Sequence, residues 1–427
     1  MRSVYTLLFY LIQPFVLLRL LWRSLSAVDY RQRLRERYGF YGHTPSAQSG
    51  SRQRYIWVHA VSVGETIASV PLIKTLAADY PGVPLLVTTM TPTGAERVEA
   101  LLGDLVEHVY APYDLPGAVR RLLRRFRPRM LIIMETELWP NMIHQCHRSD
   151  VPVVLANARL SERSAKGYQR VRWLCTPMLR ELTVAAIQSE VEAQRFYQLG
   201  LPPERAVVTG NIKFDVRLSE DDQAKTARWR RQWRAKRPIW IAASTHEGEE
   251  DIILAVHHRL LKVCSDLLLI LVPRHPERFT DAVELCEQQA LVTHRLSSEA
   301  IPGPGIQVIV GDTMGDLVGL FGVADVAFVG GSLIERGGHN MLEPALWAQP
   351  VACGPHLFNF LEISQMMKSA GGLLIADDGA ALERILERLL GDDRYREEVG
   401  RLAYGVVESN RGALGRLREQ IDRLLTE

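Results

Sequence analysis

The chain has 427 residues, of which 47% are hydrophobic and 23% charged, a globular composition that excludes a disordered protein. Its formal net charge is only +2, so the chain as a whole is no polycation. The length exceeds one ordinary core and predicts two domains of roughly 200 residues each. The five cysteines show no paired spacing, so neither a zinc site nor a disulfide framework is expected, and a reducing compartment fits.

The first element is the apolar segment Val4–Trp22, whose length is close to the ~20 residues that cross a bilayer. Only Arg2 precedes it, whereas a group of arginines follows, so the positive-inside rule places the rest of the chain in the cytoplasm. The arginines of this group are Arg19, Arg23, Arg31, Arg33, Arg35 and Arg37. We therefore predict a single signal anchor within residues 1–24.

Two alternatives stay open for this segment. Ser24-Leu25-Ser26 offers a cleavage site for a signal peptide, although Arg19 and Arg23 argue against cleavage. The other alternative is a shallow interfacial helix that is broken at Pro14.

After a polar connector (42–54), short apolar runs alternate with amphipathic stretches of helical length, which is typical of parallel sheets with helices on both faces. The first series of expected strands is Ile56–Val58, Leu85–Thr88, Val106–Tyr110, Met130–Met134, Val153–Leu155, Val184–Ile187 and Ala206–Val208. The second series starts at Ile239 and continues with Leu267–Val272, Leu291–Thr293, Gln307–Val310, Val326–Val329 and Val351–Cys353.

The fold class is therefore α/β, with two Rossmann-like doubly wound domains at residues 25–214 and 238–427. The polar run 215–237 is expected to link them, and the last helix is free to pack back on the first domain. We expect the ligand site in the cleft between the two domains.

Glu65 stands where a buried strand gives way to a helix that is expected to end near Tyr80. Ligands of parallel sheets lie beyond the carboxyl ends of the strands, so this carboxylate is a candidate general base. The alternative is that Glu65 merely occupies a first helical turn, where acidic residues are common.

Glu135 and Glu137 also follow a strand and are expected at the same edge, although helix capping would explain the second of them. The apolar neighbours Met134 and Trp139 would raise the pKa of a buried carboxyl there, which suits a base near neutral pH. Lys213 is a candidate counter-charge for an anionic group, with a solvated linker residue as the alternative.

In the second domain, Pro273, Arg274, His275 and Arg278 follow a buried strand, and arginine forks match phosphate or carboxylate. The turn Gly311–Asp316 opens a helix, and its amides at Met314 and Gly315 could hold a phosphate.

A glycine-rich loop, Gly330–Trp347, then lets a ligand approach the backbone closely. Asn340–Glu343 is expected to begin the next helix, and Glu343 could accept hydrogen bonds from two ribose hydroxyls. An ordinary flexible loop is the alternative for the glycines.

Two basic stretches, Arg120–Arg129 and Arg228–Arg237, could contact nucleic acid, contact anionic membrane lipids, or simply form solvated helix faces. We favour anionic lipids for at least one of them and expect no nucleic acid partner. The chain contains no GxGxxG and no GxxxxGK[ST] phosphate loop, and it has no Asp-x-Asp pair for a nucleotide-bound metal.

The motifs IWVHAVSVGE, MTPTGAERV, METELWPN, NARLSERS, TGNIKFD, VPRHPER and GGSLIERGGHNMLEPA occur in this order. Together with the N-terminal segment, they resemble the 3-deoxy-D-manno-oct-2-ulosonic acid (Kdo) transferases of lipopolysaccharide assembly. The resemblance covers essentially the whole chain, and METELWPN and GGHNMLEPA are the specific motifs.

The resemblance implies a GT-B fold, the donor CMP-Kdo, the acceptor lipid IVA, inversion at the anomeric carbon, no metal or other cofactor, and a location at the inner membrane. By the same resemblance, Glu65 matches the proton acceptor, and Glu135 and Lys213 match positions that stabilise the transition state. The CMP-binding positions match Pro273, Arg274, Met314, Gly315, Asp316, Asn340, Met341, Leu342 and Glu343.

Two rival functions remain at this point. One is a GT-B transferase that moves a sugar from a UDP-sugar to a lipid acceptor. The other is a catalytically inert membrane-anchored binding protein, which the intact carboxylates at Glu65, Glu135 and Glu343 speak against.

Overall fold

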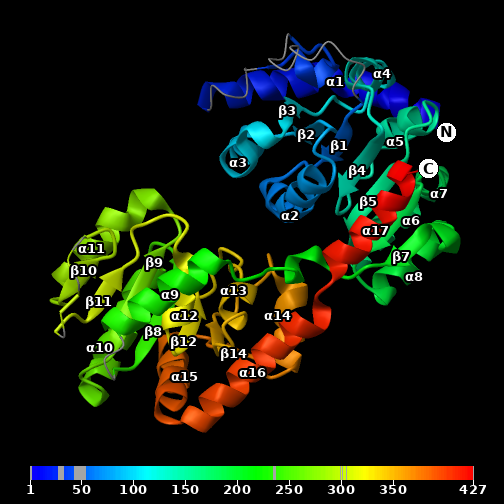
Figure 1. Cartoon of the computed structure of the whole chain (residues 1–427). Helices are drawn as coiled ribbons and strands as arrows, with labels where there is room; N and C mark the ends of the chain where they lie inside the picture. Colours follow the sequence, from blue (N-terminus) through cyan, green and yellow to red (C-terminus); the bar gives the residue numbers. More distant parts are fainter. Residues whose placement is uncertain are drawn as a thin grey trace. The chain divides into compact units, whose positions relative to one another are not determined.

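The computed structural model describes residues 2–26, 33–42, 54–233, 237–298, 300, 302–303 and 305–426. Arg31, most of the connector 42–54 and the end of the second basic stretch, 234–236, lie outside these ranges. The chain divides into two compact units, residues 1–215 with 411–427 and residues 216–410. Each unit contains one parallel sheet of seven strands (Figure 1).

Unit 1 is built on a sheet with the strand order β3-β2-β1-β4-β5-β6-β7. Its strands are β1 (Ile56–His59), β2 (Leu85–Thr89), β3 (Glu107–Tyr110), β4 (Met130–Met134), β5 (Val153–Ala158), β6 (Val184–Ile187) and β7 (Ala206–Val208). Its helices are α1 (Arg2–Ser26), α2 (Val63–Asp79), α3 (Pro92–Leu102), α4 (Pro116–Phe126), α5 (Pro140–His147), α6 (Glu162–Arg170), α7 (Arg172–Leu179), α8 (Glu190–Leu199) and α17 (Ala413–Thr426).

Alternate side chains of the strands enter two different cores, as the period of two in a strand requires. Trp57 packs in one core with α4, α5, α7 and α8, whereas Ile56 and Val58 pack in the other with α2, α3 and α17. The sheet is therefore covered on both faces, which explains the continuous apolar runs of its strands.

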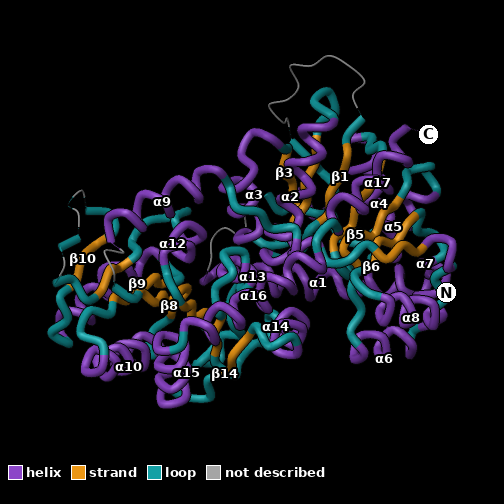
Figure 2. The backbone as a smooth tube through the Cα atoms, turned by 60° about the horizontal axis from the view of Figure 1, so that its bottom comes forward, coloured by secondary structure: helices purple, strands orange, loops and turns teal. Residues whose placement is uncertain are grey.

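Unit 2 repeats this plan with the strand order β10-β11-β9-β8-β12-β13-β14. Its strands are β8 (Ile239–Thr245), β9 (Leu268–Pro273), β10 (Thr293–Arg295), β11 (Val308–Val310), β12 (Val326–Val329), β13 (Val351–Cys353) and β14 (Leu373–Ile375). Its helices are α9 (Glu220–Trp233), α10 (Glu249–Val263), α11 (Phe279–Gln288), α12 (Leu317–Val323), α13 (Leu342–Ala345), α14 (Leu361–Ser369), α15 (Gly379–Gly391) and α16 (Asp393–Asn410) (Figure 2).

The predicted class of two doubly wound α/β domains is confirmed, but one segment differs from its prediction. Residues 215–237 were expected to form a linker, yet they contain α9, whose Trp229 and Trp233 pack in a core of unit 2. Tryptophans four residues apart lie on one helix face, so two large side chains bury this face although the segment is polar on average. The strand β14 was not expected from the sequence.

The last helix, α17, belongs to unit 1 although the chain reaches it from unit 2. Asp215 accepts hydrogen bonds from the backbone N–H groups of Gly412 and Leu414, and thereby holds the start of this helix. Leu417 and Ile421 of α17 are fully buried in the core beside α2.

The first helix, α1, is long and apolar enough to cross a membrane by its length and composition. One polar stripe of α1 contacts unit 1: Tyr5 donates to Asp114 over 2.9 Å, and Thr6 donates to Asn141 over 3.0 Å. The opposite face of the helix exposes large apolar side chains. These are Val4, Leu7, Leu8, Tyr10, Leu11, Ile12, Phe15, Leu17, Leu18, Leu21 and Trp22.

Candidate active site

In each sheet the strand order reverses at one pair of neighbouring strands. Open parallel sheets bind ligands beyond the carboxyl ends of such a pair, which we call the reversal point. In unit 1 this pair is β1 and β4, whose residues Ile56 to His59 lie opposite Met130 to Ile133. Glu65 comes after β1, and Glu135 and Glu137 come after β4. The structure thus brings these predicted carboxylates to one edge of unit 1.

Glu65 lies in the first turn of α2. Ser62 caps this helix, because its hydroxyl oxygen accepts a hydrogen bond from the Glu65 backbone N–H. Its carboxylate accepts from the Val61 N–H over 2.8 Å and from the Ser62 hydroxyl over 2.7 Å. Burial, together with the negative charges of Glu137 and Glu135, raises the pKa of Glu65 to about 7, although both hydrogen bonds lower it. A carboxyl group with this pKa is half ionised near neutral pH and can both take and release a proton.

Glu135 has a left-handed backbone with φ of +53°, which is a strained conformation for a residue with a side chain. Its N–H donates to the carbonyl oxygen of Ala156 on the neighbouring strand, which holds the backbone in this conformation. The carboxylate lies 3.3 Å from the Lys213 amine and 3.8 Å from the Arg159 guanidinium. Strain of about 1–3 kcal/mol is therefore retained where a carboxylate is held between two cations.

Lys213 is positioned by three amide side chains that follow or end successive strands. Asn211 accepts from the Lys213 N–H and donates to Gln188, and Gln188 donates to the carbonyl oxygen of Asn157. Asn157 in turn accepts from the Ile212 N–H over 3.1 Å. Sequence reasoning gave these amides no role, although each stands at the carboxyl end of a strand, which was the available signal.

Glu137 and His59 both contact Trp139. The Trp139 indole N–H donates to Glu137 over 2.9 Å, and the His59 ring contacts the Trp139 ring edge to face at 4.8 Å. Burial raises the pKa of Glu137 and lowers the pKa of His59 to about 3, so His59 is neutral at physiological pH. Trp139, expected only as an apolar neighbour, thus also supplies a hydrogen bond.

In unit 2 the chain reverses at β8 and β12. The turn after β12 is held by Glu249, which is fully buried and accepts from the backbone N–H groups of Gly331, Ser332 and Leu333. Gly330 has no room for a side chain, because a Cβ there would lie 2.7 Å from both Glu249 and the Ser244 carbonyl oxygen. The glycine-rich loop is therefore a fixed turn at this point, and Glu249, which sequence reasoning missed, shapes it.

Pro273 ends β9, and Arg274 follows it with its N–H bonded to the carbonyl oxygen of Thr245 at the end of β8. Within the part of the chain that the structure describes, the Arg274 side chain forms no ion pair. Arg278, by contrast, contacts carboxylates from Glu250, Glu247 and Asp281. Of the two predicted arginines, Arg274 is the one with a charge left for a ligand.

The turn Met314–Asp316 precedes α12. Met314 is 65% exposed and Gly315 has φ of +86°. The Asp316 carboxylate accepts from the Thr313 hydroxyl over 2.6 Å and pairs with the Lys225 amine over 2.8 Å. Met314 and Gly315 are therefore exposed residues of this turn, whereas Asp316 fixes the turn to α9.

The predicted helix start at Asn340–Glu343 begins two residues later, because α13 starts at Leu342. Asn340 donates to Glu343 over 3.0 Å and accepts from the Leu342 N–H, so it ties the loop to the first turn of this short helix. Met341 and Leu342 are buried as whole residues, so they support this loop from beneath. Burial raises the pKa of Glu343, and the charge of Arg274 opposes this shift.

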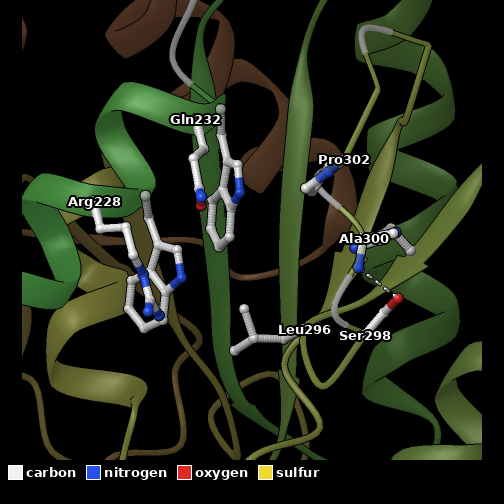
Figure 3. A pocket seen from close by; sticks show the side chains of 9 residues that line it. Arg228, Gln232, Leu296, Ser298, Ala300 and Pro302 are labelled. Carbon is white, nitrogen blue, oxygen red and sulfur yellow. Dashed lines mark hydrogen bonds between the residues drawn. The ribbon is translucent and has the colours of Figure 1, made fainter.

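A cavity of about 220 Å³ in unit 2 lies apart from these residues, between α9 and the loop after β10 (Figure 3). Its lining is Arg228, Trp229, Gln232, Trp233, His294, Leu296, Ser298, Ala300 and Pro302. None of the predicted site residues lines this cavity. Among the described residues there is also no group of three or more His, Cys, Asp or Glu side chains that could hold a metal.

Comparisons with known proteins agree with this arrangement. The family model of 3-deoxy-D-manno-octulosonic acid transferases (kdotransferases) matches residues 32–216. A transferase of this name from Haemophilus influenzae is 45% identical over 97% of this chain and 97% of its own length. One from Bordetella pertussis is 35% identical over 86% of each chain.

Among solved structures, a UDP-GlcNAc 2-epimerase from Neisseria meningitidis, bound to UDP-GlcNAc, matches with a TM-score of 0.57. The match covers 87% of this chain and all of that one at 13% sequence identity, so it supports the GT-B-like fold alone. The fold, the carboxylates after β1 and β4, and the identity to these transferases lead to one conclusion. The chain belongs to the 3-deoxy-D-manno-octulosonic acid transferase family.

Proposed function

We propose that this protein transfers Kdo from CMP-Kdo to the lipid A precursor lipid IVA, with inversion at the anomeric carbon and without a metal. The observation that carries the proposal is Glu65, a buried carboxyl group with its pKa raised to about 7 at the reversal point of unit 1. The names of the similar proteins support Kdo as the sugar.

The reaction forms a bond between an acceptor hydroxyl oxygen and the anomeric carbon, and it breaks the bond from this carbon to the CMP phosphate. In our proposal, Glu65 takes the proton of the hydroxyl, and the bonding electrons leave with the phosphate. A base on one side of the carbon and a leaving group on the other require inversion.

Glu135 is proposed to stabilise the positive charge that develops on the sugar ring as the phosphate departs. Lys213 and Arg159 hold this carboxylate in place, because they lie 3.3 Å and 3.8 Å from it. A charge that is fixed before the reaction needs no reorganisation in the transition state.

Unit 2 is proposed to hold the donor. Arg274 would contact the phosphate, and Glu343 would accept from the ribose hydroxyls. The CMP site would also include Pro273, Met314, Gly315, Asp316, Asn340, Met341 and Leu342. CMP leaves as a phosphate monoester, so fixed cations and N–H groups can do what a metal does for other sugar nucleotides.

The test of this function is transfer of radiolabelled sugar to lipid IVA from CMP-Kdo and, in parallel, from UDP-sugars. We expect product from CMP-Kdo alone, and equal rates with and without a chelator. Product from a UDP-sugar would support the rival transferase, and no product from any donor would support an inert binding protein.

We predict that Glu65→Gln lowers turnover by roughly 10²- to 10⁴-fold, the usual contribution of a general base, because an amide cannot accept the proton. CMP affinity should stay unchanged, since Glu65 belongs to unit 1. Steady-state kinetics and calorimetry measure the two quantities. Glu162→Gln is the matched control, because Glu162 lies on the exposed face of α6 in the same unit. Turnover like that of the unaltered enzyme would refute the assignment.

We further propose that α1 attaches the enzyme to the cytoplasmic side of the inner membrane as an interfacial helix. Its polar contacts with Asp114 and Asn141 occupy one face, which favours this alternative over a span surrounded by lipid. Asp114 also accepts from two N–H groups of α5, so α1 is bonded to a rigid part of unit 1.

Anionic lipid headgroups are the proposed partner of the first basic stretch. A cavity of about 360 Å³ is lined by Arg54, Arg120, Arg124 and Arg127, and the structure gives none of the four an ion pair among the residues it describes. Basic side chains near an anionic surface contribute ~1 kcal/mol each.

We predict that Leu11→Glu combined with Phe15→Glu releases part of the protein from membranes. Both side chains are more than 60% exposed on α1, and each stabilises insertion by ~1.5–3 kcal/mol, so binding should fall at least 10-fold per position. Activity on lipid IVA should fall more than activity on a short-chain soluble analogue, because tethering concentrates the enzyme at its substrate.

Fractionation at low and high salt and assays on both acceptors measure these effects. Val263→Glu in unit 2 is the control, since Val263 is also exposed but lies on α10. Unchanged membrane binding would refute the role of α1, and equal losses on both acceptors would refute tethering.

A further inference from the structure

Two histidines meet at the reversal point of unit 2, and neither has a role in the function proposed above. His246 follows β8, and His339 lies in the glycine-rich loop after β12. Their Nε2 atoms are 2.8 Å apart, and their rings stack with 5.1 Å between centroids and 14° between planes. At this distance one Nε2 carries a hydrogen and donates it to the other, so each ring constrains the protonation of its partner.

The loop backbone fits this pair closely. Gly331 has φ of +65°, and a Cβ at this position would lie 3.0 Å from two ring atoms of His339. Glu249 fixes the same glycine through its N–H over 2.7 Å. The His339 ring therefore rests on a turn that is itself held rigidly.

The groups that face the pair are mainly cationic. Arg274 and His275 follow β9, with the His275 ring 5.4 Å from the His246 ring, and Arg336 belongs to the same loop as His339. Arg278 also faces the pair, but Glu250, Glu247 and Asp281 neutralise it. Arg274 and Arg336 form no ion pair within the described ranges, although Glu343 lies near enough for the charge of Arg274 to lower its pKa, so part of the positive charge at this edge is left for a ligand.

Burial, followed by these positive charges, lowers the pKa of His246 to about 4 and the pKa of His339 to about 3. The unliganded pair is therefore neutral at pH 7. An anion bound against Arg274 would oppose the positive field at this edge, and a nearby negative charge favours the protonated form of a histidine. The negative charge of a bound phosphate thus raises the pKa of the pair, and it does so more strongly for the dianion of CMP than for the singly charged phosphate of the donor.

We infer that His246 and His339 act as a proton-linked anion site, which takes up one proton when the nucleotide phosphate of the donor binds. The bridging hydrogen stays between the two Nε2 atoms, and the added proton goes to the free Nδ1 of the ring that donates this hydrogen, so the pair carries one positive charge. When the bond from the sugar to the phosphate breaks, the phosphate gains a second negative charge, and the bridged cation stabilises it. No proton leaves the pair in this step. The inference rests on the proposed donor site, because it requires a phosphate beside Arg274.

The experiment is calorimetric titration of the full-length enzyme in detergent with CMP at pH 7.5, in buffers of different ionisation enthalpy. The dependence of the heat on the buffer gives the number of protons taken up. We expect the unaltered enzyme to take up about one proton per CMP bound. Affinity should weaken as pH rises from 7 to 8.5, because the bound state loses its extra proton. Cytidine, which lacks the phosphate, should cause no uptake.

The variants His246→Gln and His339→Gln keep a polar atom near each Nε2 but cannot hold the proton, so CMP should bind them without uptake. His147→Gln on the exposed end of α5 is the matched control and should behave like the unaltered enzyme. Binding of CMP to the unaltered enzyme without proton uptake would overturn the inference and leave the donor site standing. Absence of CMP binding, or CMP affinity unchanged by Arg274→Ala, would refute the proposed donor site itself.

Discussion

A carboxylate that is removed from water stays charged only if hydrogen bonds and cations replace the water, and much of this structure depends on how far they do so. Glu249 receives three backbone N–H groups and holds a turn of unit 2. Glu65 receives one backbone N–H and one hydroxyl, and it faces two further carboxylates of unit 1. The three N–H donors suit Glu249 to a structural role. The two donors of Glu65 leave its pKa near neutral pH, as a general base requires.

The two sheets provide comparable positions and give them different chemistry. In each unit, polar side chains gather at the carboxyl ends of the two strands at the reversal point. The connections that follow these strands do not cover the backbone between them, so a crevice is left there. In unit 1 the position after β4 holds a strained Glu135 between Lys213 and Arg159. In unit 2 the position after β12 holds glycines that bring backbone N–H groups and His339 to the same edge. Carboxylates thus gather at one edge and cations at the other, which fits the proton abstraction and phosphate binding that we propose.

Much of this could be predicted from the sequence. Short apolar runs located nearly all the strands, and the residues after them included Glu65, Glu135 and Arg274. The average polarity of residues 215–237 predicted a linker where the structure has α9. Trp229 and Trp233 bury one face of this helix, although the segment is otherwise charged. The roles of the Asn157, Gln188 and Asn211 amides depend on contacts across strands far apart in the sequence. The same holds for His246 and His339, which are 93 residues apart and meet only in the folded sheet.

The most direct test of the central claim, that Glu65 is the base, is the dependence of kcat/KM for Kdo transfer on pH, since this quantity reports the pKa values of the free enzyme. A base must be ionised to act, so the rate should fall tenfold per pH unit below the pKa of Glu65, with its midpoint near 7. The rate should be level above this midpoint until other groups titrate. A rate that stays constant down to pH 5 would contradict the account, because Glu65 would then be protonated without loss of activity.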